Sequence, residues 1–184
     1  MLTFIIGGAR SGKSRFAQSL CSPGARVVYL ATARVEDDEM RARVERHRAD
    51  RPSHWRTIEE PLAIAGAVQS VCGDADFILL DCLTVWLGNL CWEYRERPDA
   101  ERESRACGEI DALAAAGAHC EIVLVSNEVG WGIVPEHPLG RQFRDLQGLV
   151  NQRTAALADR VFLTVAGIPI GIKPPAGMTM LPPG

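Results

Sequence analysis

The residues best suited to chemistry form a glycine-rich run near the amino terminus, Gly7-Gly-Ala-Arg-Ser-Gly-Lys-Ser14, which fits G-x-x-x-x-G-K-[ST]. It follows an apolar run and opens a helical stretch, the context in which this pattern binds phosphate. Glycines let successive backbone N–H groups face phosphate oxygens, and the start of the helix adds its positive dipole end. We expect all of its residues to contact a nucleoside triphosphate: Gly7, Gly8, Ala9, Arg10, Ser11, Gly12, Lys13 and Ser14. The alternative is a glycine-rich turn without a ligand.

Within this run, two side chains have distinct predicted roles. The Lys13 ammonium would act on the terminal phosphates as a catalytic charge, and the Ser14 hydroxyl would ligate Mg²⁺. Asp81 closes another apolar run, Phe77-Ile-Leu-Leu-Asp81, and is predicted to lie at the carboxyl edge of a sheet beside the same Mg²⁺. Its alternative is a helix or turn cap. Glu128, which follows a further run, is a second candidate for orienting substrate or metal, and the sequence does not decide between the two.

The elements that must position these residues alternate along the chain. Continuous apolar runs predict strands buried on both faces at 2–6, 26–31, 76–80, 121–125 and 160–165. Helical stretches are predicted at 13–20, 37–50, 61–71, 104–116 and 139–158. This alternation predicts an α/β fold, a P-loop NTPase (RecA-like) three-layer sandwich with a mostly parallel central sheet. We expect one catalytic domain over 1–173, an extended or mobile tail over 174–184, and a solvated connection or exposed helix over 93–105.

Composition narrows the class of protein. The 184 residues are 47% hydrophobic and 23% charged, an ordinary globular balance. The net charge of −3 argues against a nucleic-acid partner, which would require a basic surplus. No apolar run is long enough for a membrane span, and the first residues do not resemble a signal peptide. The six cysteines form no C-x-x-C pair and are interpreted as reduced thiols of a cytoplasmic protein, serving as small hydrophobes.

One histidine lies within the 37–50 helical stretch. Met40, Val44 and His47 have the spacing i, i+4 and i+7, so they share a helix face. By spacing alone, a histidine on an apolar face is more often packed than catalytic. Both interpretations remain open at this point.

Several blocks together resemble the adenosylcobinamide kinase / adenosylcobinamide-phosphate guanylyltransferase family. They are GGARSGKS at 7–14, Ala-Thr at 31–32 followed by DDEM at 37–40, His47 with Arg51-Pro52, NEVGWGIVPE at 127–136 and FRDLQGLVNQR at 143–153. The blocks run in family order from residue 1 to about 173. The resemblance implies two reactions. The aminopropanol hydroxyl of adenosylcobinamide is phosphorylated with ATP or GTP, and GMP is then transferred from GTP through a guanylyl-histidine to give adenosylcobinamide-GDP.

The resemblance also implies roles for individual residues. Family members often carry two adjacent histidines in this helix, whereas here the pair reads Arg46-His47, so His47 is the expected nucleophile and His54 its nearest rival. His119 and His137 match no family nucleophile position. Further nucleotide contacts carry over to Thr32, Ala33, Arg34, Arg48, Ala49, Asp50, Arg51 and Glu59. Arg141 and Arg144 are expected either to bind phosphate or to cover a helix face.

The resemblance further implies a homo-oligomer, a trimer as in family members. Two other functions compete with the bifunctional one. A RecA-like ATPase or nucleic-acid motor is disfavoured by the acidic charge. A small-molecule kinase without nucleotidyl transfer would need only the phosphate loop and Asp81.

Overall fold

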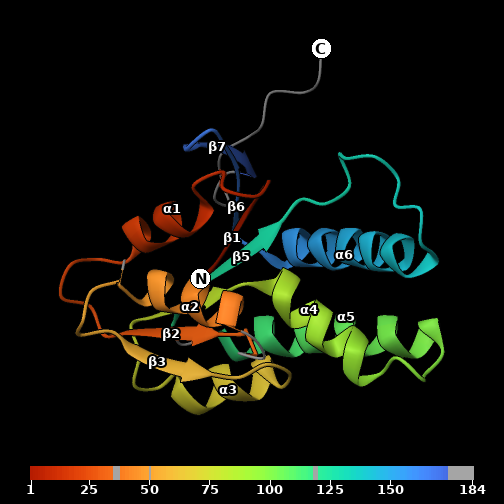
Figure 1. Ribbon diagram of the computed structural model, residues 1–184. Helices are drawn as coiled ribbons and strands as arrows, with labels where there is room; N and C mark the ends of the chain where they lie inside the picture. The colour runs from red at the N-terminus through yellow and green to blue at the C-terminus, as the bar shows by residue number, and fades with distance from the viewer. Residues whose placement is uncertain (35–37, 50, 118–119, 174–184) are drawn as a thin grey trace.

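The computed structural model describes residues 1–34, 38–49, 51–117 and 120–173. Strands in this part of the chain form one seven-stranded sheet, ordered β3-β2-β4-β5-β1-β6-β7 (Figure 1). The strands are β1 Leu2–Gly7, β2 Val27–Ala31, β3 Arg56–Glu59, β4 Phe77–Asp81, β5 Glu121–Asn127, β6 Arg160–Val165 and β7 Ile168–Lys173. The helices are α1 Lys13–Leu20, α2 Asp38–Ala49, α3 Ile64–Val71, α4 Leu83–Glu93, α5 Asp99–Ala116 and α6 Pro138–Leu157. All strand pairs are parallel except β6 with β7.

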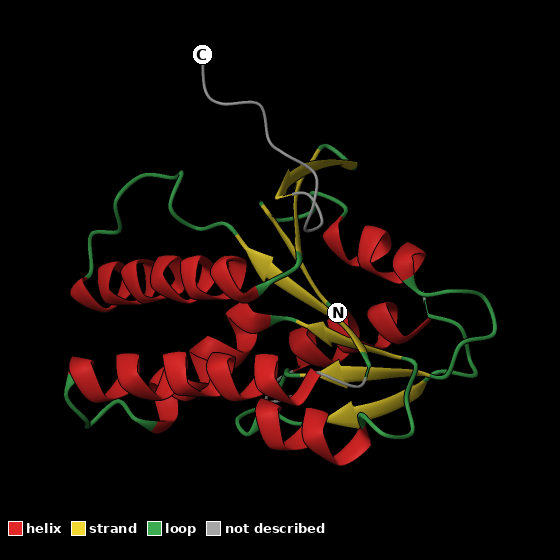
Figure 2. Ribbon diagram, turned by 180° about the vertical axis from the view of Figure 1, so that it is seen from behind, coloured by secondary structure: helices red, strands yellow, loops and turns green. Residues whose placement is uncertain are grey.

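Helices cover both faces of the sheet, which gives three layers (Figure 2). Side chains alternate along a strand, so β4 serves two cores. Ile78 and Leu80 pack in the core beneath α3, α4, α5 and α6, whose largest buried side chain is Trp86. Phe77 and Leu79 pack in a smaller core beneath α1. Among the described helices, none is long and apolar enough to cross a lipid bilayer.

The carboxyl ends of the parallel strands lie along one edge of the sheet. Strands β1, β2, β4 and β5 are parallel, so Gly7, Ala31, Asp81 and Asn127 all end at the same edge. The chain adds β2 and β4 on one side of β1 and adds β6 on the other. Ligands of open α/β sheets bind outside the carboxyl ends of the strands, where the direction of winding reverses in this way. The topology therefore places the glycine-rich loop at the sheet edge where such ligands bind.

The predicted fold class is confirmed, with all five predicted strands present. Three elements were not predicted. Strand β3 is short and polar except for Ile58, and β7 carries Pro169, which an edge strand tolerates because its outer N–H groups need no partner. Helix α4 buries Leu83, Trp86, Leu87 and Leu90. That spacing is helical and was present in the sequence.

Two helix boundaries differ from the prediction. Helix α3 begins at Ile64 rather than at 61, because the Glu60 carboxylate accepts hydrogen bonds from the backbone N–H groups of Leu62 and Ala63, both at 2.8 Å, in the preceding turn. Helix α5 begins at Asp99, inside the segment expected to be solvated, and Arg102 on its first turns is buried and pairs with Asp99. The predicted tail, 174–184, lies outside the described residues.

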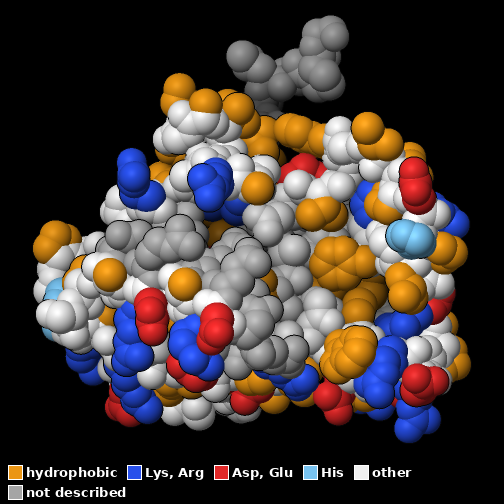
Figure 3. Space-filling model, in the orientation of Figure 1, with side chains coloured by type: hydrophobic (Ala, Val, Ile, Leu, Met, Phe, Trp, Pro, Cys, Tyr) orange, Lys and Arg blue, Asp and Glu red, His pale blue; other side chains and the backbone are white. Residues whose placement is uncertain are grey.

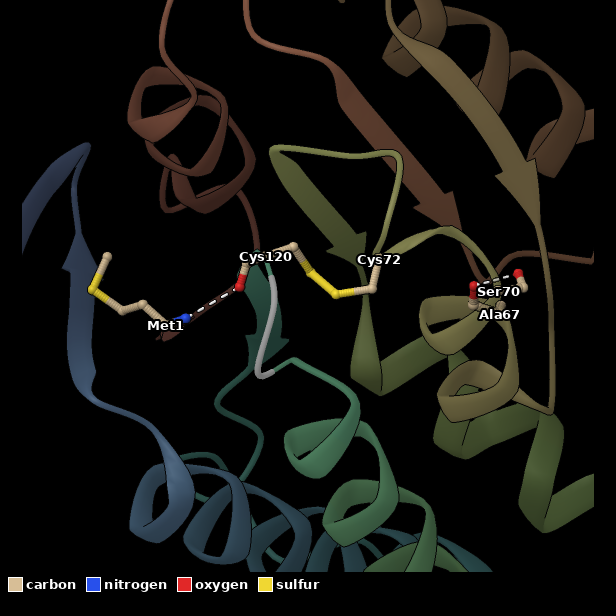
Figure 4. Close-up of a disulfide and its surroundings, with 5 residues drawn as sticks. All are labelled: Met1, Ala67, Ser70, Cys72 and Cys120. Atoms are coloured by element: carbon tan, nitrogen blue, oxygen red, sulfur yellow. Dashed lines mark hydrogen bonds between the residues drawn. A yellow bond between two sulfur atoms is a disulfide. The ribbon is translucent and has the colours of Figure 1, made fainter.

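The prediction that all six cysteines are reduced is wrong for two of them. Cys72, at the end of α3, and Cys120, before β5, form a disulfide (Figure 4). The pairing could not be predicted from spacing, because the two cysteines are 48 positions apart in the sequence and only the fold brings them together. Cys21, Cys82, Cys91 and Cys107 are free thiols, as predicted.

Candidate active site

The glycine-rich loop joins β1 to α1 in a conformation that requires glycine at two positions. A Cβ atom at Gly7 would collide with the backbone carbonyl oxygen of Thr164 on β6 and would lie 2.9 Å from Ser11 Oγ. Gly12 has a φ of 95°, in the left-handed region, and a Cβ there would lie 3.0 Å from Gly167 Cα. The backbone N–H of Gly167, in the β6–β7 turn, donates to Ser11 O at 2.8 Å. The hairpin therefore supports the loop from behind.

Lys13 begins α1 and folds back over the loop. Its side chain is buried, and Nζ donates to the Gly8 carbonyl oxygen at 2.6 Å. Ser11 Oγ is buried too, and it forms no hydrogen bond with any described group. A buried hydroxyl without a partner is costly, so this donor fits an anion held in the loop. Ser14 is half-buried in the first turn of α1.

Asp81 lies where it was predicted, at the carboxyl end of β4. It is half-buried, and the phenol of Tyr29 on β2 donates to Asp81 Oδ2 at 2.9 Å. The neighbouring Cys82 thiol is half-buried. Burial, and then the Asp81 charge, raise the pKa of Cys82 to about 11, while the Lys13 ammonium acts in the opposite direction. Asp81 and Lys13 thus both act electrostatically on this thiol.

Glu128 follows β5 directly beside the phosphate loop. Its backbone N–H donates to the Gly7 carbonyl oxygen at 3.0 Å. Its carboxylate, however, accepts from the Gly130 N–H at 2.6 Å and so closes a turn in the loop that leads away from the sheet. The structure therefore gives Glu128 a local partner, while Asp81 lies at the carboxyl end of β4.

A buried polar cluster holds the end of β5, and sequence reasoning missed it. Thr84 Oγ1 accepts from the Asn127 N–H at 2.8 Å, and Asn151 Nδ2 donates to the Asn127 carbonyl at 3.1 Å. Gln147 donates to Ser126 Oγ at 3.1 Å and to Asn151 Oδ1 at 3.0 Å. The available signal was a pair of amides at i, i+4, which places Gln147 and Asn151 on one face of α6. They fix the backbone that lies beside Gly7.

The expected nucleophile, His47, lies on α2, but its side chain is outside the described part of the structure, and so is Asp50. Arg48 and Ala49, near the end of that helix, are exposed. Helix α2 lies above β2 on the same side as α1 (Figure 1). Arg51, just beyond it, places its guanidinium 3.6 Å from the centre of the Tyr29 ring.

The remaining predicted contacts follow β2 and β3 at the same edge. Thr32 is fully buried and its hydroxyl both donates to Cys82 O at 2.9 Å and accepts from Cys82 N at 3.1 Å, which ties the ends of β2 and β4 together. Ala33 and Arg34 are half-buried, and Arg34 pairs with Glu93 at 3.5 Å. Glu59 is exposed at the end of β3, opposite Ala31.

The rival histidine lies elsewhere. His54 is exposed and lines a pocket with Gly24, Arg26 and Asp74, which precede β2 and β4 and so belong to the amino edge of the sheet. His137 directly precedes α6 at the end of the loop after β5, and His119 is outside the described residues. His54 thus lies at the opposite edge of the sheet from the glycine-rich loop.

The two arginines of α6 are also placed. Arg141 donates to the carbonyl oxygens of Pro135 and Glu136, at 3.1 and 2.6 Å, and so fastens the end of the loop after β5. Arg144 pairs with the adjacent Asp145 at 3.3 Å. Both side chains therefore have local partners within the protein.

A groove lies outside the candidate active site. A groove of about 530 Å³ runs between α4, α5 and α6, lined by Trp92, Phe143, Leu146 and Leu149 among others. Hydrophobic side chains gather on that side of the molecule (Figure 3). Leu139, which lines the groove, and Trp131 and Ile133, in the loop after β5, are between 73% and 97% exposed. Large exposed apolar patches on globular proteins often mark binding sites.

The fold and the glycine-rich loop together define a P-loop nucleotide-binding enzyme. A family model described as cobinamide kinase / cobinamide phosphate guanyltransferase matches residues 3–172. The Bifunctional adenosylcobalamin biosynthesis protein CobU of Escherichia coli is 43% identical over 181 residues, covering 94% of this chain and 100% of that protein. The protein of the same name from Salmonella typhimurium is 44% identical with the same coverage. The Bifunctional adenosylcobalamin biosynthesis protein CobP of Pseudomonas aeruginosa is 45% identical over 177 residues, covering 94% and 98%.

The chain therefore belongs to the cobinamide kinase / cobinamide phosphate guanyltransferase family, and the resemblance found in the sequence is confirmed. It is a transferase with kinase and guanylyltransferase activities in cobalamin biosynthesis. This favours the bifunctional interpretation over the kinase without nucleotidyl transfer and over the motor ATPase.

Proposed function

We propose that one site at the carboxyl edge of the sheet performs both reactions. In the first, the aminopropanol hydroxyl of adenosylcobinamide attacks the γ-phosphorus of ATP or GTP held in the loop 7–14. In the second, GMP passes from GTP to the new phosphate and adenosylcobinamide-GDP is formed. The observation that carries the proposal is the convergence of the buried Lys13, the unpartnered Ser11 hydroxyl and Asp81 at one edge of the sheet.

In the kinase reaction the protein positions groups and stabilises charge. The loop N–H groups and the Lys13 ammonium offset the negative charge that moves onto the leaving phosphate. Lys13 is already held over the loop by Gly8 O at 2.6 Å, so it exchanges one oxygen acceptor for another when phosphate binds. No covalent enzyme intermediate is needed for this step.

In the transfer reaction we propose His47 as the nucleophile. A neutral imidazole nitrogen attacks the α-phosphorus of GTP, a nitrogen–phosphorus bond forms, and pyrophosphate leaves. Lys13 and the loop stabilise the departing pyrophosphate. The phosphate monoester made in the first reaction then attacks the guanylyl-histidine and releases the imidazole. Two steps through a histidine avoid direct attack of one polyanion on another.

The donor set suits Mg²⁺. Ser14 offers a hydroxyl oxygen and Asp81 a carboxylate oxygen, and Mg²⁺ in nucleotide sites is held by one or two protein oxygens together with phosphates and water. When bound, the ion would neutralise phosphate charge. Asp81 is a better candidate than Glu128, because the Glu128 carboxylate is engaged by the Gly130 N–H. Thr32, Ala33, Arg34, Arg48, Ala49, Asp50, Arg51 and Glu59 are proposed as further nucleotide contacts.

We further propose a homo-oligomer, a trimer by family resemblance, acting in the cytoplasm where nucleoside triphosphates are available. The exposed Trp92 and Ile133 beside the α4–α6 groove support a contact between copies. Light scattering after gel filtration tests the assembly, and a monomer at micromolar concentration would contradict it. We also propose that residues 1–173 form a single catalytic domain.

The decisive experiment labels the protein with GTP carrying radioactive α-phosphate. We expect a covalent label that is labile in acid and stable in base, as a histidine phosphoramidate is. His47→Asn should abolish the label and retain part of the kinase activity, while His54→Asn, altered at the opposite edge of the sheet, should label normally. A melting curve controls for folding, since Asn costs about 1 kcal/mol where the histidine packs. Labelling that persists in folded His47→Asn would refute the assignment.

A further inference from the structure

Tyr29 is a buried tyrosine on β2 with a polar partner at the site. Its side chain is 4% exposed and packs in the smaller core with Ile5 and Leu79. Its hydroxyl donates to Asp81 Oδ2 at 2.9 Å, and 52 residues separate the two in the chain. Phenylalanine would fill the same apolar space, so the core alone does not account for the hydroxyl.

The direction of this hydrogen bond is fixed. The Asp81 carboxylate has no hydrogen to donate, so the Tyr29 phenol is the donor. The carboxylate is the acceptor, and hydrogen bonds to a charged acceptor are about twice as strong as neutral ones. The bond engages one carboxylate oxygen and thereby restricts rotation of the Asp81 side chain.

Arg51 secures the other side of the tyrosine. Its guanidinium lies over the Tyr29 ring, 3.6 Å from the centroid, and one of its nitrogens lies 3.5 Å from Thr57 Oγ1 on β3. Stacking of this kind attracts the cation to the ring face. Arg51, Tyr29 and Asp81 thus form a continuous chain from the α2–β3 connection to the end of β4.

We propose that Tyr29 is a positioning residue that orients the Asp81 carboxylate towards magnesium, and that Arg51 holds Tyr29 in place. The inference rests on the proposed function, in which Asp81 faces Mg²⁺. Loss of the hydroxyl would leave the carboxylate in place but free to rotate. The expected consequence is weaker Mg²⁺-dependent nucleotide binding, by about three- to tenfold for the loss of one such hydrogen bond.

The test compares four proteins: Tyr29→Phe, Asp81→Asn, the double variant and Tyr94→Phe. Tyr94 is a matched control because it is the only other tyrosine and is also stacked by an arginine, Arg105, at 4.3 Å. The measurement is the Mg²⁺ concentration that gives half-maximal binding of a non-hydrolysable GTP analogue, with binding in EDTA as the reference. Melting curves establish that each variant is folded.

We expect Tyr29→Phe to raise the Mg²⁺ midpoint about three- to tenfold, with binding in EDTA unchanged. Asp81→Asn should raise it further, and the double variant should equal Asp81→Asn, because Tyr29 acts through that carboxylate. Tyr94→Phe should match the wild type.

The outcomes distinguish a failure of the positioning role of Tyr29 from a failure of Asp81 as a metal ligand. A wild-type midpoint in folded Tyr29→Phe, or an added shift in the double variant, would overturn the positioning role while leaving the proposed function intact. A wild-type midpoint in Asp81→Asn would instead remove Asp81 from the proposed metal site. If Tyr29→Phe does not fold, Arg51→Met decides, because it keeps the hydrophobic stem while removing the stacked cation. Arg51 is also a proposed nucleotide contact, so the Mg²⁺ midpoint of this variant is compared with its own binding in EDTA. A Mg²⁺ midpoint raised relative to that reference supports the proposal, and a wild-type midpoint overturns it.

Discussion

Replacing Gly7 with alanine should destabilise the protein far more than the same change at Gly8. The added methyl group at Gly7 would meet the backbone carbonyl of Thr164, on the strand that pairs with β1, and that oxygen cannot rotate away. Ser11 Oγ lies 2.9 Å from the same point. Forcing a methyl group into such a packed space costs about 3 kcal/mol, the upper end of the usual range. For a chain of this size that lowers the melting temperature by roughly 6–12 °C.

Gly8 provides the matched control one residue further on. Apart from its chain neighbours, no atom of the described residues lies within 4 Å of a Cβ placed there, so Gly8→Ala should alter stability by less than about 0.5 kcal/mol. Thermal unfolding without nucleotide, followed by circular dichroism, measures both variants. A Gly7→Ala protein that melts within about 2 °C of the wild type would refute the steric argument.

Gly8→Ala should instead lose at least about tenfold in nucleotide affinity, because phosphate is expected to approach that open side. Unchanged affinity would contradict the assignment of the loop.

Three further changes test the site and the disulfide. Lys13→Ala should abolish both activities, and near-normal rates with bound nucleotide would exclude the loop as the catalytic cradle. Asp81→Asn should reduce Mg²⁺-dependent turnover much more than the melting temperature; a collapse of the melting temperature instead would make Asp81 a structural cap and Glu128 the better metal candidate. The Cys72–Cys120 bond closes 48 residues and is worth about 4 kcal/mol by chain entropy. Dithiothreitol should therefore lower the melting temperature of the wild type but not of Cys72→Ala/Cys120→Ala, and an unaffected wild type would show that the bond is absent in solution.

The sequence was most informative where one local segment contains the whole signal. The phosphate loop needs only consecutive residues, and β4 is recognisable because it is apolar on both faces and ends in Asp81. Two of the three elements that were missed lack such a signal, whereas the helical spacing of α4 was present in the sequence. Strand β3 has four residues, and β7 is an edge strand whose isoleucines Ile168, Ile170 and Ile172 are exposed, so neither resembles a buried strand.

The partners of site residues were not predictable because they are distant in the chain. Tyr29 reads as an ordinary apolar strand residue until β2 and β4 pair and bring its hydroxyl to Asp81. Gln147 and Asn151 belong to a block that carried the family resemblance, yet their role in holding Asn127 appears only when α6 packs on β5. The disulfide was missed for the same reason. Local sequence patterns therefore identify the candidate functional residues, whereas strand pairing and helix packing determine which side chains hold them in position.

The β6–β7 hairpin determines when, during synthesis of the protein, the phosphate loop can fold. Thr164 and Gly167, which abut Gly7 and Gly12, emerge from the ribosome long after the loop that they support. Strand β1 lies between β5 and β6, so the nascent amino-terminal segment must wait for most of the chain before either neighbour exists. Chains fold during synthesis from the amino terminus, and pairings distant in sequence form slowly. A chain that stops before β6 would contain the complete glycine-rich motif and lack the backbone that abuts it, so the nucleotide site matures only after β6 and the β6–β7 turn have been synthesised.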